Sequence, residues 1–245
     1  MTMLPPNPRY ERKFLAYGLS LAEVWVAVRR HPAMFREIYP ARAVNNIYLD
    51  SSGLRDYFSH VSGAASRVKT RIRWYGQLNG HIEKPTLERK IKRGLVGGKV
   101  AHPLPALFLN GCVARRVLDS VLDRAEMPEV LRWALREMHP CLLNRYQRQY
   151  WLSADGRFRL TVDSDLQFFG VRTGTVAATA SRPRNPAVII ELKFDPRHAE
   201  YAGLVTNALP FRLARCSKYV LGVESLGVVQ CSSAYEPLHA EIDDD

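Results

Sequence analysis

Hydrophobic and charged residues alternate along several segments of the chain, and each such segment predicts a β-strand with one apolar and one charged face. The clearest case is SRVKTRIRWYG, residues 66–76, where Lys69, Arg71 and Arg73 share one side and a valine, an isoleucine and a tryptophan share the other. Cations spaced about 7 Å apart along a strand repel one another. This face therefore needs an anionic partner.

The same alternation recurs in RYERKFLA, VNNIYLD, TLERKIK, NRYQRQYW, RFRLTVDSD and VIIELKF. Arginine and lysine dominate the charged faces, where carboxylates stand singly. A half-exposed antiparallel sheet also alternates in this way, but its solvent side normally mixes charge signs with serine and threonine. The arginine-rich faces favour a sheet that closes with its charged side inward, as a polar tunnel. The carboxylates on these faces are Glu11, Glu88, Asp163 and Glu191.

Helical patterns interrupt the strands. Ser20 and Glu23 form a capping box that predicts a helix start, and helical spacing predicts a helical insert over residues 104–139. Few strand–helix alternations indicate an α+β fold, with an eight-stranded antiparallel β tunnel or barrel and peripheral helices. We expect one domain over residues 9–226 and a loose tail over 227–245.

The chain of 245 residues has 35 lysines and arginines against 24 acidic residues, a net charge of +11, which also indicates an anionic partner. The basic residues are interleaved with carboxylates, and no recognition helix or stacking platform is evident, so we expect no nucleic-acid partner. Four cysteines without a CxxC pair fit a reducing compartment. Since no apolar run reaches the roughly 18 residues of a membrane span, we expect a cytoplasmic location.

The segments RYERKF, NNIYLD, VKTRIRWYG, LERKIK, YQRQYW, FRLTVDSDL, IIELKF and CSKYV, in this order, resemble the VTC domain, the polyphosphate polymerase module of the vacuolar transporter chaperone complex. That family is a branch of the triphosphate tunnel metalloenzymes, alongside the CYTH-type triphosphatases and adenylate cyclases. The resemblance implies a tunnel that binds ATP with Mn²⁺ or Mg²⁺. It also implies transfer of the γ-phosphoryl group to a growing polyphosphate chain.

The resemblance also implies roles for individual side chains. Glu191 would be the principal metal ligand, with Glu11 and Glu88 as further ligands. Phosphoryl transfer needs positioning and charge neutralisation rather than a covalent nucleophile. The residues that bind substrate phosphate would be Lys13, Lys69, Arg71, Arg73, Lys90, Arg148, Arg159, Lys193 and Lys218, and those acting in catalysis would be Arg71, Arg73, Lys90, Arg148, Arg159 and Lys218.

One position departs from the wider superfamily, whose first strand carries the pattern ExExK. Arg9 stands in the place of the first glutamate, which leaves one carboxylate fewer for a second metal and favours transfer over hydrolysis. ATP and polyphosphate would be the partners, and a separate membrane protein would be needed for translocation. A triphosphatase or cyclase of the same superfamily and a binding module without turnover remain the alternatives.

Overall fold

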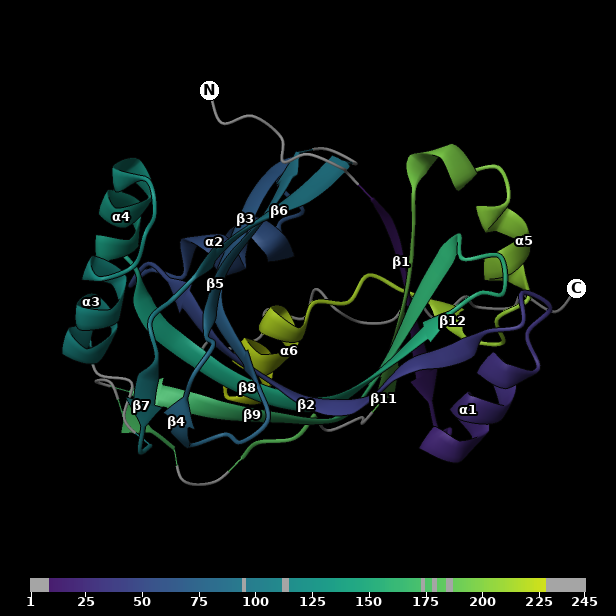
Figure 1. The fold of residues 1–245 in the computed structure, drawn as a ribbon, viewed down its shortest axis with the longest axis horizontal. Coiled ribbons are helices and arrows are strands. Elements are labelled where there is room, and N and C mark those ends of the chain that lie inside the picture. Colours follow the sequence, from purple (N-terminus) through teal and green to yellow (C-terminus); the bar gives the residue numbers. More distant parts are fainter. Residues whose placement is uncertain are drawn as a thin grey trace, which may run out of the picture.

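The computed structural model describes residues 9–93, 96–111, 115–172, 175–177, 180–183 and 187–227. Except for Gly227, the tail expected to be loose lies outside these residues. Most of the described chain forms one large antiparallel sheet with helices packed around it (Figure 1).

Ten strands form the main sheet, in the order β12-β1-β11-β9-β8-β2-β3-β5-β6, with β10 paired to β9. A separate small sheet pairs β4 with β7. The strands are β1 (Tyr10–Tyr17), β2 (Arg36–Asp50), β3 (Ser66–Tyr75), β4 (Gly80–Ile82), β5 (Thr86–Arg93), β6 (Val96–Pro103), β7 (Leu107–Leu109), β8 (His139–Leu152), β9 (Phe158–Arg172), β10 (Thr175–Val176), β11 (Ala187–Phe194) and β12 (Arg212–Leu213).

A serine side chain caps the start of α1 and of α6. At the first one, the Ser20 hydroxyl accepts a hydrogen bond from the Glu23 amide while the Glu23 carboxylate accepts one from the Ser20 amide at 2.7 Å, as predicted. Within the described ranges no helix is both long and apolar enough to cross a membrane. The helices are α1 (Leu21–Arg29), α2 (Arg55–Val61), α3 (Arg115–Asp123), α4 (Glu129–Arg136), the 3-10 helix η1 (Pro196–His198), α5 (Ala202–Asn207) and α6 (Lys218–Ser225).

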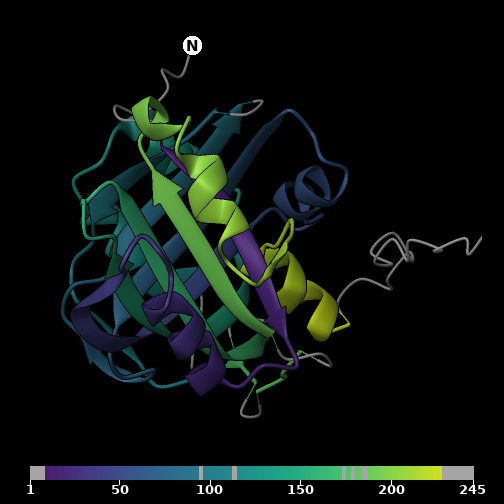
Figure 2. The ribbon, with the colours of Figure 1, turned by 90° about the vertical axis from the view of Figure 1, so that its right-hand side faces the viewer.

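The sheet bends so that two walls rise from a common floor (Figure 1). Strands β2, β8 and β9 run across the floor, β3, β5 and β6 form one wall, and β1 and β11 form the other. Helices α3 and α4 lie outside the first wall, α1 and α5 lie outside the second, and α6 lies between the walls. Figure 2 shows α5 alongside the wall of β1 and β11.

The antiparallel α+β fold is confirmed, whereas the expected number of strands and the expected closure were wrong. The main sheet has ten strands instead of eight, and no backbone pairing in the described part of the chain joins β6 to β12 or β1. Strand β2 begins at Arg36 rather than Val44, and residues 96–103, where no strand was predicted, form β6. Gly97 and Gly98 have no side chains, so β6 shows little alternation in the sequence.

Each wall has its own hydrophobic support on the outside. Ile72 and Trp74 of β3 are buried with residues of α3 and α4 in one cluster. Phe14, Leu160 and Ile190 of β1, β9 and β11 are buried with residues of α1 and α5 in another. Burial of each such side chain contributes about 1.5–3 kcal/mol. The outward apolar faces thus fix the walls and leave the charged faces inside.

Helix α6 packs on the inner face of the floor, where a third apolar cluster joins Tyr219, Val220 and Val223 to Leu142 and Phe168. The close approach depends on a glycine in the helix. A Cβ atom added at Gly222 would lie 2.5 Å from Cδ2 of Leu142 and 2.7 Å from Cδ1 of Phe168.

We predict that Gly222→Ala lowers the free energy of unfolding by about 1–3 kcal/mol, because the added methyl group overpacks this contact. Urea denaturation measures the effect. Gly203→Ala on α5 is the matched control, since a Cβ there meets no atom within 4 Å and alanine is the better helix former by up to about 1 kcal/mol. Equal changes in the two variants would contradict the packing of α6.

Candidate functional site

Cross-strand register brings the charged residues of the strands onto one face. Arg71 of β3 lies opposite Glu88 of β5, and Lys69 lies opposite Lys90. On the other wall, Lys13 of β1 lies opposite Glu191 of β11. Directly opposed residues of an antiparallel pair share a face, so each alternating strand adds its charges to the same surface.

We call this surface the basic face and define it by ten cationic side chains and four carboxylates. These fourteen side chains have a formal surplus of six positive charges, and Arg67 and Lys92, which oppose each other next to Lys69 and Lys90, add to it at the edge of the face. All of the predicted site residues lie in it, together with Lys99 and Asp163. The cations are Lys13, Lys69, Arg71, Arg73, Lys90, Lys99, Arg148, Arg159, Lys193 and Lys218, and the carboxylates are Glu11, Glu88, Asp163 and Glu191.

Glu88 holds the cations of the first wall. Its carboxylate accepts hydrogen bonds from Nε and Nη2 of Arg71 at 2.9 and 2.7 Å and from Nζ of Lys99 at 2.8 Å, and Nη1 of Arg73 lies 3.6 Å away. Burial alone would raise the pKa of Glu88, but the charges of Arg71 and Arg73 hold it well below its usual value. Glu88 is therefore ionised throughout the physiological pH range.

Asp163 is fully buried on the floor of the sheet. Arg148 donates to both of its carboxylate oxygens at 2.6 Å, and Nζ of Lys218 lies 2.5 Å from Oδ2. Glu191 lies within 3.4 Å of Lys218 and 3.6 Å of Arg148. Burial opposes ionisation of Asp163, and the charges of Arg148 and Lys218 overcome it, so its pKa is lowered. These contacts fix the N-terminus of α6 to the floor.

The ammonium group of Lys13 lies between two carboxylates of the second wall. Its Nζ is 3.2 Å from Oε1 of Glu11 and 3.5 Å from Oε1 of Glu191. Glu11 also pairs with Lys90 at 2.8 Å, and Glu191 pairs with Lys193 at 2.8 Å. Burial by itself would raise the pKa of Glu11 and of Glu191, but the charges of the neighbouring lysines lower both pKa values. Both carboxylates are therefore ionised and could act as ligands.

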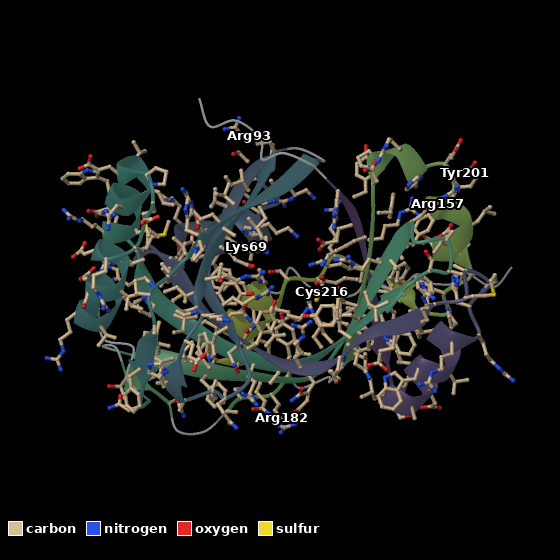
Figure 3. The ribbon with its side chains drawn as sticks, in the orientation of Figure 1. Lys69, Arg93, Arg157, Arg182, Tyr201 and Cys216 are labelled. Carbon is tan, nitrogen blue, oxygen red and sulfur yellow. The ribbon has the colours of Figure 1, made fainter. Side chains whose placement is uncertain are left out.

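Lys69 reaches the segment that leads into α6. Its Nζ donates to Oγ of Ser217 at 2.7 Å, while Nζ of Lys13 donates to the carbonyl of Cys216 at 2.9 Å. Figure 3 labels Lys69 on β3 and Cys216 in the segment between β12 and α6. No described carboxylate lies within 4.0 Å of the Lys69 ammonium. Burial, followed by the charges of Lys13, Lys90 and Arg71, lowers the pKa of Lys69 well below its usual value.

A surface pocket of about 180 Å³ lies at one end of the basic face. Arg159 and Lys193 line it together with Arg9, Arg157 and His198. Arg159 and Lys193 are opposed across β9 and β11, so the pocket continues the cationic rows of these two strands. The position that departs from ExExK, Arg9, thus adds a positive charge at this end.

The carboxylates suit a divalent metal whose coordination shell is made up partly of protein carboxylates and partly of phosphate oxygens. Among the described residues, no three histidine, cysteine or acidic side chains lie close enough to hold a metal alone. Glu11 and Glu191 flank one point, the Lys13 ammonium, and both are ionised. Magnesium is commonly held by one or two carboxylates, with phosphate oxygens and water completing its shell. The donor set present fits such a site.

Sequence reasoning assigned no role to several residues of this site. Asp163 stood on the charged face by alternation, and only the fold shows that it holds Arg148 and Lys218. Arg73 donates to Oδ1 of Asn46 at 2.8 Å and to the Tyr146 hydroxyl at 3.1 Å, and both partners come from other strands. Pairing of β2 with β3 sets Asn46 opposite Arg73, and pairing of β2 with β8 brings Tyr146 to the same face, which a single-strand pattern does not reveal.

The fold is that of the CYTH-like triphosphate tunnel proteins. A candidate adenylyl cyclase from Hippeastrum with a dominant triphosphatase activity matches at a TM-score of 0.50 and 12% identity, over 89% of this chain and 95% of that one. A candidate adenylate cyclase from Vibrio parahaemolyticus matches at 0.50 and 8%, over 89% and 98%. The sequence profile of the VTC domain matches residues 8–227, and the chain belongs to the VTC domain family. No curated protein matches the sequence.

We predict that Asp163→Asn lowers the free energy of unfolding by about 3–5 kcal/mol, because it removes the buried carboxylate that lies nearest to Arg148 and Lys218 and leaves them to share Glu191. Thermal or urea denaturation measures the loss. Asp165→Asn is the control: its exposed pair with Arg182 at 2.9 Å should change stability by no more than about 0.5 kcal/mol. An unchanged free energy of unfolding in Asp163→Asn would show that the contacts of Asp163 with Arg148 and Lys218 do not fix α6.

We also predict that the protein takes up a proton when it binds tripolyphosphate at alkaline pH. A lysine whose pKa is lowered is partly neutral above that pKa, and an anion beside it restores the charge, so affinity falls as pH rises. Titration calorimetry in buffers of different ionisation enthalpy measures the number of protons taken up when tripolyphosphate binds. Lys69→Arg keeps its charge and should show less uptake; the same uptake in both proteins would exclude Lys69 as its source.

Proposed function

We propose that the chain is an ATP-dependent polyphosphate polymerase that transfers the γ-phosphoryl group of ATP to the end of a polyphosphate chain. The surplus of six positive charges on the basic face is the observation that carries this proposal. A nucleoside triphosphate has about four negative charges at neutral pH. The remaining charge leaves room for a second anion beside it, which a polymerase needs as the acceptor. Membership of the VTC domain family supports the same function.

The side chains would act by positioning and by neutralising charge. Arg71 would turn its guanidinium group from Glu88 to phosphate oxygens, which it can bind in pairs. Arg73 and Arg148 would stay in place and offer phosphate the N–H groups that their present partners do not take. Lys13 and Lys218 would supply point charges. An oxygen of the acceptor's terminal phosphate forms the new bond to the γ-phosphorus, the bond from that phosphorus to the bridging oxygen breaks, and ADP leaves with the electron pair. The acceptor oxygen is already ionised, so no general base is required.

Glu191 and Glu11 would hold the Mn²⁺ or Mg²⁺ ion at the place where they flank Lys13. When bound, the metal would neutralise charge on the phosphate oxygens and orient them. Glu88 was also predicted as a metal ligand. Its carboxylate contacts Arg71 and Lys99, so it would reach a metal only after these cations turn to phosphate.

The reaction would take place in the cytoplasm, where ATP is supplied, and a separate membrane protein would receive the polyphosphate. A triphosphatase is the second candidate, and the activity of the Hippeastrum neighbour favours it. Arg9 favours phosphoryl transfer over hydrolysis, because it stands in the place of a carboxylate that would help to hold a second, water-activating metal. A binding module without turnover is the third.

Incubation of the purified protein with ATP and Mn²⁺ tests the proposal. We expect chains that an exopolyphosphatase degrades. Release of orthophosphate alone would indicate the triphosphatase, and binding without product would indicate the module. The double variant Arg71→Ala, Arg73→Ala should lose all product, because the triphosphate then lacks two guanidinium groups of one strand. Arg182→Ala, whose side chain is exposed, is the matched control and should keep full activity; loss of activity in both variants would remove the assignment.

A further inference from the structure

The proposed function gives no role to a group of four side chains at one end of the basic face. The guanidinium group of Arg42, on β2, lies over three tyrosine rings. Its central carbon is 5.3 Å from the ring centre of Tyr39, 5.4 Å from that of Tyr75 and 5.0 Å from that of Tyr150. We call these four residues the aromatic cluster. They come from β2, β3 and β8, so no single strand of the sequence shows them together.

Strand register places the aromatic cluster on the inner side of the sheet. Arg42 opposes Arg148 of the basic face across β2 and β8, and Tyr39 opposes Tyr150. Tyr39 and Arg42 are three residues apart and in a regular strand would lie on opposite faces. A bulge between them adds one residue to β2 and sets both on the inner face. Bulges re-aim side chains in this way and are frequent beside functional sites.

Arg42 is a cation without a counter-charge in the part of the chain that the structure describes. No carboxylate there lies within 4.0 Å of its guanidinium group, and no acceptor there takes a hydrogen bond from it. The arginine opposite, Arg148, is already paired with Asp163. Like charges directly opposed across two strands are destabilising. The tyrosine rings hold the Arg42 guanidinium group in place, and its N–H groups remain for acceptor atoms of a ligand.

The rings of the aromatic cluster are also open to a ligand. Tyr39 is 48% exposed and Tyr75 is 49% exposed, while Tyr150 is half-buried. Aromatic side chains that only support the fold are enclosed here, as Trp74 and Trp151 are on the outer faces of their strands. Half-exposed aromatic rings beside an arginine form the kind of surface on which nucleobases stack.

The order of side chains along β3 matches the order of groups in a nucleoside triphosphate. Alternate residues of this strand share its inner face at intervals of about 7 Å. A base on the tyrosine at one end would be followed by a ribose and then by phosphate groups on the two arginines. The lysine at the other end would meet the acceptor phosphate. These four residues, in this order, are Tyr75, Arg73, Arg71 and Lys69.

The proposed metal site lies near the lysine end of this row. Lys13, whose ammonium group lies between the carboxylates of Glu11 and Glu191, donates to the carbonyl of Cys216. Lys69 donates to the hydroxyl of the next residue in the chain, Ser217. The γ-phosphate of a nucleotide whose base lies on the aromatic cluster would therefore point toward these carboxylates.

We propose that the aromatic cluster binds the nucleobase of the nucleoside triphosphate. The base stacks on Tyr39 and Tyr75, and the N–H groups of Arg42 donate to acceptor atoms of the base and the ribose. Base binding fixes the direction of the nucleotide, so that its triphosphate runs toward Lys69 and the acceptor approaches from that end. This inference rests on the proposed function, because it takes the basic face to be the triphosphate site.

Ribose 5-triphosphate, which has the sugar and the phosphates of ATP but no base, provides the test. Titration calorimetry with Mg²⁺ present compares it with ATP. The wild-type protein should bind ATP at least about fivefold more tightly, because stacking on an aromatic side chain contributes that much to the binding of a base. In Tyr39→Leu combined with Tyr75→Leu the preference should disappear, while the affinity for ribose 5-triphosphate stays within about twofold.

Two further variants control for the loss of the rings. Tyr39→Phe combined with Tyr75→Phe keeps both rings and should keep the preference for ATP. Tyr17→Leu is the matched control, because Tyr17 is 49% exposed and lies outside the aromatic cluster, and it should bind both ligands as the wild type does. Loss of the preference in the phenylalanine variant would assign the effect to the hydroxyl groups and overturn stacking.

The comparison of ATP with ribose 5-triphosphate decides between the base site and other roles. Equal binding of the two ligands by the wild type would overturn the base site and leave the proposed function intact, since chain growth from ATP is measured separately. A preference for ATP that survives in the leucine variant would place the base elsewhere. Equal weakening of both ligands in that variant would assign the aromatic cluster to phosphate or to the fold. Either result would overturn the proposal.

Two outcomes concern other functions of the same face. A preference for ATP that depends on the tyrosines, in a protein that forms no polyphosphate, would support the base site and contradict the polymerase. A cationic surface with aromatic rings can also bind single-stranded nucleic acid. Tighter binding of a short oligoadenylate than of ATP, lost in the leucine variant, would assign the aromatic cluster to nucleic acid and overturn the proposal. Failure of ATP and ribose 5-triphosphate to bind would contradict the base site and the proposed function together.

Discussion

Repulsion among the ten cations of the basic face is the constraint on which the rest of the structure depends. Two like charges about 4 Å apart cost roughly 4 kcal/mol at an effective dielectric constant of 20. Four carboxylates offset part of this cost, because each forms ion pairs with more than one cation, as Glu88 does with Arg71 and Lys99. The apolar clusters outside each wall supply the stability that lets the surplus persist.

The carboxylates have two tasks in this arrangement. Asp163 is fully buried and holds Arg148 and Lys218 in place, so it belongs to the support of the site. Glu11 and Glu191 belong to the strands nearer the open side of the sheet and flank Lys13, and under the proposed function they would hold the metal ion. The division follows from burial: the more enclosed carboxylate fixes cations, and the more accessible pair can exchange them.

Alternation along the strands predicted much of this site from sequence. Arg71, Arg73 and Glu88 were expected on one charged face because each strand carries its own signal, and the structure places them there. The sequence could not reveal contacts that depend on which strands pair, such as Arg73 with Asn46 and Tyr146. The sequence also could not predict whether the sheet closes, because no local pattern shows whether the last strand pairs with the first. Lys99 was missed because two glycines, Gly97 and Gly98, directly precede it in β6, and their lack of side chains hides the alternation.

The charge surplus predicts that the basic face is destabilised by its own cations until a phosphate chain offsets them. The free energy of unfolding, measured at fixed ionic strength with sulfate, pyrophosphate, tripolyphosphate and long polyphosphate in turn, tests this claim most directly. Stability should rise with chain length at equal phosphate concentration, because a longer chain neutralises more of the face at once. Equal stabilisation by sulfate and by long polyphosphate would contradict it.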